Sequence, residues 1–144
     1  MFSLEDCYSK GLLRKTAPSP LKAHRSLEMA RTWLREAGTI LRAGAPRSAM
    51  VAIYMSYFHA ARALLFRDGV REKSHGCIGL YLESYREKGL LEEEWLLQFE
   101  RIRSLRHEDQ YMLGADPSVA EIEEFFRTAP EFITAMEELL GTPA

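Results

Sequence analysis

The chain has 144 residues, of which 28% are charged and 47% hydrophobic, and its formal net charge is −2 at pH 7. This is the composition of a folded globular protein, and at about 150 residues per domain the length predicts a single domain. Alanine, leucine, glutamate and arginine contribute 66 residues, whereas valine, isoleucine and threonine contribute 15. Because the first group favours helices and the second favours strands, the composition excludes an all-β domain.

Neither export nor a membrane span is predicted. Glu5 and Asp6 stand where a signal peptide would carry basic residues. The longest uncharged stretch, residues 48–61, has 14 residues, which is short of the roughly 20 needed to cross a bilayer. Two cysteines, Cys7 and Cys77, are too few for a disulfide framework, and we expect both to be buried or incidental thiols. These features predict a cytoplasmic protein that is not associated with a membrane.

Glycine and proline divide the first half of the chain into helical segments. A short amphipathic segment over residues 4–14 precedes Pro18-Ser19-Pro20, in which Ser19 is a good helix N-cap. The helix that follows carries apolar residues at helical spacing and ends near Gly44. The next predicted helix, residues 46–68, has two apolar stripes and should therefore be buried on most sides.

The second half continues the same pattern. A shorter helix is predicted over residues 77–88, and another begins near Leu91 and ends before Gly114. The last helix begins at the capping box that starts with Ser118. Its apolar spacing continues through Pro130 without a slip, so we expect one kinked helix and not two.

These segments predict an all-α fold, an up-and-down helical bundle of four main helices plus two short ones, in a single domain over residues 1–144. The charges are unevenly divided. Residues 1–71 hold 12 basic and five acidic side chains, whereas residues 72–144 hold seven basic and 16 acidic ones. This division predicts either a basic face beside an acidic face, or basic helices that pack against acidic ones.

Several classes of chemical site are not predicted. There is no strand, glycine-rich loop and helix in succession, as phosphate-binding loops require. His75 and Cys77 lie two residues apart without a second pair at zinc spacing. Di-iron bundles carry Glu-x-x-His on their helices, and no predicted helix has it, because Glu72 and His75 fall in the basic loop over residues 71–76. Neither cysteine has a recognisable base with an orienting residue. We therefore expect no metal site and no cofactor.

The densest polar cluster lies at residues 101–111. Arg103 and His107 are four residues apart and share a helix face, whereas Arg101 lies about 120° around the helix from His107. Arginine and histidine together can act on a phosphodiester without a metal. Histidine moves the proton, and arginine stabilises the charge on the phosphoryl oxygens. The alternative is a solvated face on which the arginines pair with neighbouring carboxylates.

The sequence resembles the small prokaryotic HEPN proteins (higher eukaryotes and prokaryotes nucleotide-binding domain). The similarity extends over roughly residues 7–140, and the order and spacing of its motifs are its most specific part. The motifs are Cys7–Leu13 followed by Pro18-Ser19-Pro20, then Ser48–Gly69, Lys73-Ser74-His75, and Arg106 with Asp109-Gln110-Tyr111. The resemblance implies a helical bundle that is usually dimeric and is often encoded beside a minimal nucleotidyltransferase.

In several branches the HEPN proteins are metal-independent ribonucleases, including toxins of toxin–antitoxin pairs. Their signature is an arginine and a histidine with four to six residues between them on a late helix, and Arg101 and His107 fit this spacing. The resemblance makes His107 the general acid or base and Arg101 the stabiliser of the transition state. Phosphate-binding residues would be Arg103, Arg106 and Tyr111.

Two features depart from the ribonuclease pattern. Ile102 stands where active members often carry a polar residue, and the ending of the motif at Tyr111 is consistent with a non-catalytic partner. The sequence therefore favours a non-catalytic nucleotide- or RNA-linked module that partners a minimal nucleotidyltransferase in a toxin–antitoxin-like system. The alternative is a metal-independent endoribonuclease that uses Arg101 and His107 at a dimer interface. A third hypothesis is a helical interaction or scaffold protein whose function does not involve nucleotides.

A homodimer is predicted on separate grounds. The helix over residues 46–68 is apolar nearly all round, and it carries Tyr54, Tyr57 and Phe58. A small bundle need not bury so many aromatic residues, so part of this surface is expected to pack against a second copy of the chain.

Overall fold

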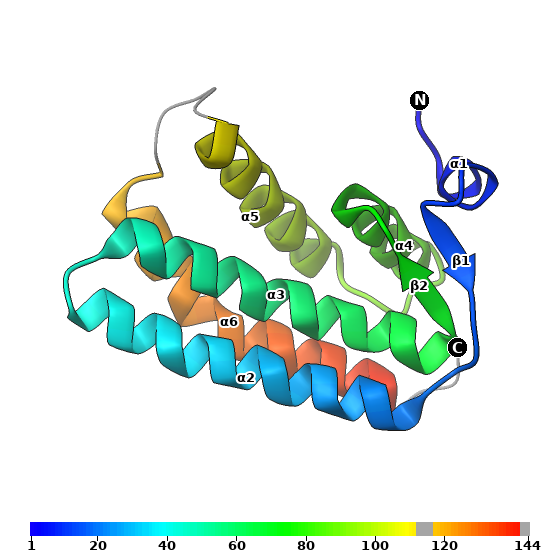
Figure 1. Cartoon of the computed structure of the whole chain (residues 1–144), viewed down its shortest axis with the longest axis horizontal. Helices are drawn as coiled ribbons and strands as arrows, with labels where there is room; N and C mark the ends of the chain where they lie inside the picture. The colour runs from blue at the N-terminus through cyan, green and yellow to red at the C-terminus, as the bar shows by residue number, and fades with distance from the viewer. Residues whose placement is uncertain (112–116, 142–144) are drawn as a thin grey trace.

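The computed structural model describes the backbone of residues 1–111 and 117–141, and the side chains of all of these residues except 107–111 (Figure 1). The described part contains six helices and one two-stranded sheet. In chain order these are α1 Leu4–Ser9, β1 Leu13–Lys15, α2 Pro20–Arg42, α3 Pro46–Asp68, β2 Val70–Glu72, α4 His75–Glu87, α5 Glu93–Tyr111 and α6 Val119–Leu140. The predicted all-α bundle is confirmed.

Three long helices form the body of the molecule. Figure 1 shows α2 and α3 side by side, with α6 running behind them. The helix α5 packs against α3 and leaves the layer at an angle, and α4 lies beside α5 near the end that holds α1 and the two strands. The interior of the bundle is therefore built around α3.

The helix α3 is buried on most of its sides, as its two apolar stripes predicted. It is also long and apolar enough to cross a membrane by length and composition, but 72% of that window is buried inside the protein. The apolar residues of α3 thus form the core of a bundle. Pro46 begins the helix, and Gly69 ends it in the left-handed conformation with φ of 78°.

The predicted helix ends agree with the observed caps. The Ser19 hydroxyl accepts a hydrogen bond from the backbone N–H of Lys22 at 3.1 Å, and the capping box at Ser118 is present. The helix α6 continues through Pro130 as a single helix. The helix α4 begins at His75, two residues earlier than predicted, because Ser74 caps it.

Two polar networks fix α4 and α5 against α3. The Tyr57 hydroxyl donates to the Phe125 carbonyl at 3.0 Å, and Gln98 of α5 donates to Tyr57 at 3.2 Å. At the end of α3, the Tyr81 hydroxyl donates to the Asp68 carboxylate at 2.5 Å. These bonds hold the helices that carry the candidate site.

The short strands were not predicted. β1 and β2 pair antiparallel, with Leu13 opposite Glu72 and Lys15 opposite Val70. Each strand has three residues, too few for an alternating pattern to stand out in the sequence. The segment expected as one helix over residues 4–14 is therefore a helix followed by a strand.

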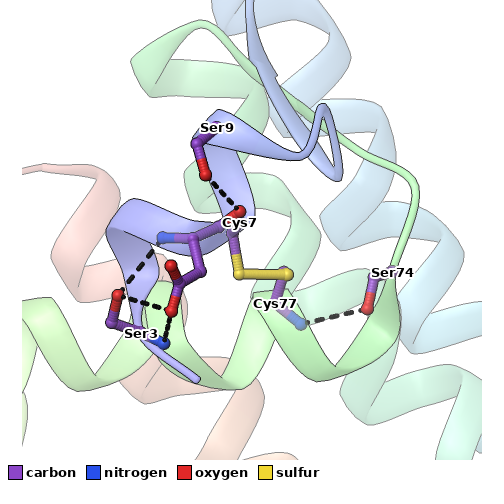
Figure 2. Close-up of a disulfide and its surroundings, with 6 residues drawn as sticks. Ser3, Cys7, Ser9, Ser74 and Cys77 are labelled. Atoms are coloured by element: carbon purple, nitrogen blue, oxygen red, sulfur yellow. Dashed lines mark hydrogen bonds between the residues drawn. A yellow bond between two sulfur atoms is a disulfide. The ribbon is translucent and has the colours of Figure 1, made fainter. Parts of the chain in front are cut away.

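The expectation that the two cysteines are thiols is wrong. Cys7 of α1 and Cys77 of α4 form a disulfide, with 6.0 Å between their Cα atoms, although 70 positions separate them in the sequence (Figure 2). Both residues are buried. The pairing depends on how α1 packs against α4, and no local pattern in the sequence carries that information.

Candidate functional site

The predicted site residues of α5 point in two directions. Arg101 is exposed and forms an ion pair with Glu121 of α6. The hydrogen bond from Arg101 lowers the pKa of the Glu121 carboxyl. Ile102, the next residue, is fully buried in the core. Arg101 is therefore directed to the α6 side of the helix.

Arg103 and Arg106 lie on the side of α5 that faces α3 and α4. The Arg103 guanidinium pairs with Glu100 at 2.9 Å. It also reaches the first turn of α4, where Nη1 lies 3.9 Å from the position of a β-carbon on Gly76. The guanidinium carbon of Arg106 stands 4.9 Å from the centre of the Tyr54 ring. The structure thus brings Arg103 and Arg106 together, and directs Arg101 away from them.

A tyrosine–histidine pair lies beside Arg106. The Tyr54 hydroxyl and Nδ1 of His75 form a hydrogen bond of 2.7 Å, which joins α3 to the first residue of α4. The His75 ring also packs on Phe58, with 4.3 Å between the ring centres. Tyr54 is buried, whereas His75 retains exposed surface. Tyr54 therefore orients a histidine for which the sequence indicated no orienting residue.

The surroundings keep both members of this pair uncharged at neutral pH. Burial lowers the pKa of His75, and the nearby positive charges of Arg106, Arg103 and Arg62 lower it further. Burial raises the pKa of Tyr54 to about 12. Which atom donates depends on the tautomer of His75. In the tautomer in which the Tyr54 hydroxyl donates to Nδ1, the neutral His75 ring carries its own proton on Nε2. His75 can then offer a hydrogen-bond donor next to two arginines.

We call Tyr54, His75, Arg103 and Arg106 the α3–α4–α5 cluster. Within the described side chains, Arg103 and Arg62 have carboxylate partners, the latter in Glu72 at 2.7 Å. Among the same side chains no carboxylate pairs with Arg106, whose guanidinium is held by the Tyr54 ring. The cluster consequently presents donors and net positive charge, a combination that suits an anion.

A groove between α4 and α5 begins at this cluster. It has a volume of about 520 Å³, and Ser74 and Arg103 are among the residues that line it. Its walls carry apolar and acidic side chains and one residue that precedes α1, namely Leu80, Leu96, Leu97, Glu83, Glu93, Glu100 and Phe2. A ligand whose anionic group lies at Arg103 could therefore extend along the apolar side chains of this groove, which stand among its three carboxylates.

The remaining predicted site residues are outside the described side chains. His107 and Tyr111 belong to α5, but their side chains are not described. Sequence reasoning missed Tyr54 and His75 as a pair. The Lys73-Ser74-His75 turn was noted as a family motif, but the partner of His75 lies 21 positions away.

The helical fold and the sequence motifs together point to one protein family. A family model of the HEPN domain matches residues 23–139, which run from the first turn of α2 to the last turn of α6 and include the whole α3–α4–α5 cluster. The chain therefore belongs to the HEPN domain family, as its motifs indicated. A comparison with curated proteins gives no match.

Proposed function

We propose that the protein is a HEPN module that binds the phosphate groups of RNA or of a nucleotide through the α3–α4–α5 cluster, without cleaving them. The observation that carries this proposal is the convergence of Arg103, Arg106 and His75 at one point of the surface. Each can donate to a phosphate oxygen, and arginine in particular matches the geometry of a phosphate group.

The position of Arg101 favours binding over cleavage. Its guanidinium pairs with Glu121, on the side of α5 away from the cluster. Ile102, which stands where active members of the family often carry a polar residue, is buried and cannot contact a substrate. The two arginines best placed for a ligand, Arg103 and Arg106, are thus not the arginine of the ribonuclease signature.

Binding is tested with labelled single-stranded RNA in fluorescence anisotropy titrations at several salt concentrations. Replacement of Arg103 and Arg106 by glutamine should weaken binding and reduce the slope of log K against log salt by about 1 for each lost phosphate contact. Arg127→Gln, on the exposed surface of α6, is the matched control because its arginine pairs with Glu124 away from the cluster. Equal affinities for all variants would remove the cluster from the binding site.

A second candidate is a metal-independent endoribonuclease that uses Arg101 and His107. It is favoured by the exposure of the Arg101–Glu121 pair, because such surface pairs cost little to break. The test is RNA cleavage in the presence of EDTA, with His107→Ala and Arg101→Gln beside the wild type. Cleavage lost in both variants would support this candidate, and cleavage retained in His107→Ala would contradict it.

The assembly is proposed from the family alone, because Tyr54, Tyr57 and Phe58 of α3, whose number first suggested a dimer, are buried inside the single chain. We infer a homodimer that acts in the cytoplasm and that partners a minimal nucleotidyltransferase in a toxin–antitoxin-like system. Light scattering of the purified protein tests the dimer, and co-purification with the product of a neighbouring nucleotidyltransferase gene tests the partner. A monomer would contradict the proposed dimer, and a nucleotidyltransferase that elutes separately would contradict the proposed partner.

A further inference from the structure

A disulfide lies next to the proposed binding site, and we propose that it is a redox-operated latch. In the oxidised protein the Cys7–Cys77 bond holds α1 on α4 and keeps Phe2 in the α4–α5 groove. Reduction by a dithiol releases α1 and opens the groove. The effect of this release on RNA binding rests on the proposed function, whereas the release itself does not.

The disulfide joins α1 to the helix that carries His75. Cys77 lies in the first turn of α4, two residues after His75, and its backbone N–H donates to the Ser74 hydroxyl that caps this helix (Figure 2). Cys7 lies in α1, which precedes the region matched by the family model. The bond thus ties a segment outside the matched domain to the edge of the cluster.

Apart from the disulfide, α1 is held by the packing of a few side chains and by a hydrogen bond from the Leu12 N–H to the Cys7 carbonyl at 2.8 Å. The helix has six residues, and isolated helices shorter than about 12 residues are marginal in water. Its capping box, between Ser3 and Asp6, stabilises the helix internally and does not attach it to the bundle. Partly buried Leu4 and Tyr8 pack against the core. The position of α1 on α4 therefore depends strongly on the cross-link.

The chain after α1 is held independently of the cross-link. The Lys73 N–H donates to the Leu12 carbonyl and the Thr16 N–H to the Gly69 carbonyl, each at 2.8 Å. Between them β1 pairs with β2. Gly11, with φ of 70°, forms the turn that joins α1 to this ladder. Reduction should consequently release residues before Leu12 and leave the bundle folded.

Phe2 connects the latch to the groove. It lines the groove together with Leu80, Leu97 and Arg103, and its own side chain is 43% exposed. A ligand with a phosphate at Arg103 that extends along α4 and α5 meets Phe2. Release of α1 removes this obstacle, so the reduced protein should bind RNA more tightly.

The chemistry of the switch is thiol–disulfide exchange. A dithiol supplies two electrons and two protons, the bond between the two sulfur atoms breaks, and Cys7 and Cys77 become thiols while the dithiol becomes a disulfide. Both cysteines are buried, so a thiolate reaches a sulfur only during a local opening of the chain around the intact bond, and α1 is released once that bond is broken.

Hydrogen exchange measured by mass spectrometry tests the latch without any ligand. In the reduced wild type, amides of residues 4–11 should lose most of their protection, whereas α2 and α3 should remain protected and change only as far as the lower global stability requires. The Cys7→Ser/Cys77→Ser variant should show the same pattern, and added dithiol should not change it further. Equal exchange in oxidised and reduced protein, or loss of protection throughout the bundle on reduction, would overturn the latch.

RNA titrations test the expected effect of the latch on RNA affinity. The reduced wild type should bind several-fold more tightly than the oxidised protein, and oxidised Phe2→Gln should match the reduced wild type. Leu21→Gln is the control, because Leu21 is an exposed apolar residue of α2 that does not line the groove. Release of α1 with unchanged RNA affinity would overturn the regulatory role. If no form binds RNA, the proposed function fails, and hydrogen exchange alone decides whether the latch exists.

Discussion

The carboxylate of Glu100 lies where a β-carbon on Gly79 would stand, so that α4 and α5 approach each other closely at this point. Glu100 is also the partner of Arg103, at 2.9 Å. The small size of one glycine on α4 thus helps to determine where an arginine of the proposed binding site is held.

Gly79→Ala should therefore displace Glu100 and loosen the position of Arg103. Because these atoms are the end of a flexible side chain, the movement of Glu100 should cost little unfolding free energy, and the main effect that we expect is weaker RNA binding through Arg103. Gly76→Ala is the matched control in the same helix, because a β-carbon there meets its nearest neighbours at 3.6 and 3.9 Å. Urea unfolding and RNA titrations of both variants check this. Equal RNA affinity of the two variants would contradict the argument.

Tyr54→Phe should change His75 while leaving the aromatic surface under Arg106. The hydroxyl that bonds to Nδ1 of His75 is lost, at a cost of about 1 kcal/mol in unfolding free energy. The NMR signals of the His75 ring should shift because Nδ1 has lost its partner. Tyr57→Phe serves as the control, since its hydroxyl bonds to Phe125 in the core and not to a histidine. An unchanged His75 spectrum in Tyr54→Phe would show that this tyrosine does not orient the ring.

The main helices could be predicted because their signals are local. Ser19, Gly69 and Ser118 cap helices by bonds that span three or four residues, and the apolar spacing of α3 records its burial on most sides. The β1–β2 pairing and the disulfide join segments separated by more than 50 residues. No short-range sequence pattern indicates this strand pairing or this disulfide, and both become visible only in the tertiary structure.

The candidate site could be predicted only in part, because its geometry also depends on contacts between segments that are far apart in the sequence. The residues of α5 stood out as a cluster of charges, but the sequence could not show that Arg101 pairs with Glu121 while Arg106 faces Tyr54. The 120° between Arg101 and His107 indicated that they lie on different flanks of α5. Which flank meets α3 and α4 was determined only by packing.

Loss of the disulfide should destabilise the protein without abolishing its fold. A cross-link that closes a loop of this length, with 70 positions between the cysteines, is expected to contribute about 2–4 kcal/mol through the reduced entropy of the unfolded chain. Cys7→Ser/Cys77→Ser and reduced wild type should therefore unfold at lower urea concentration than the oxidised protein, with the helical circular dichroism retained before the transition. Coincident unfolding curves for oxidised and reduced protein would contradict the expected contribution.

Stability should fall as the pH drops below 6.5, and His75 should be one cause. Burial and the charges of Arg106, Arg103 and Arg62 hold the pKa of His75 below 6.5. Arg103 and Arg62 have carboxylate partners, Glu100 and Glu72. These carboxylates do not reverse the lowering of the His75 pKa.

Between the folded and the unfolded pKa of His75 the unfolded chain binds more protons than the folded protein, so the unfolding free energy rises with pH in that window. His59 adds to this with the same sign, because burial and Arg62 lower its pKa too. His75→Asn, which keeps an acceptor for the Tyr54 hydroxyl, should flatten the dependence only in part. The exposed His24→Asn in α2 is the control. Urea unfolding at pH 5.5 and 7.5 measures the slopes, and an unchanged slope in His75→Asn would show that His75 protonates as readily in the folded protein as in the unfolded chain.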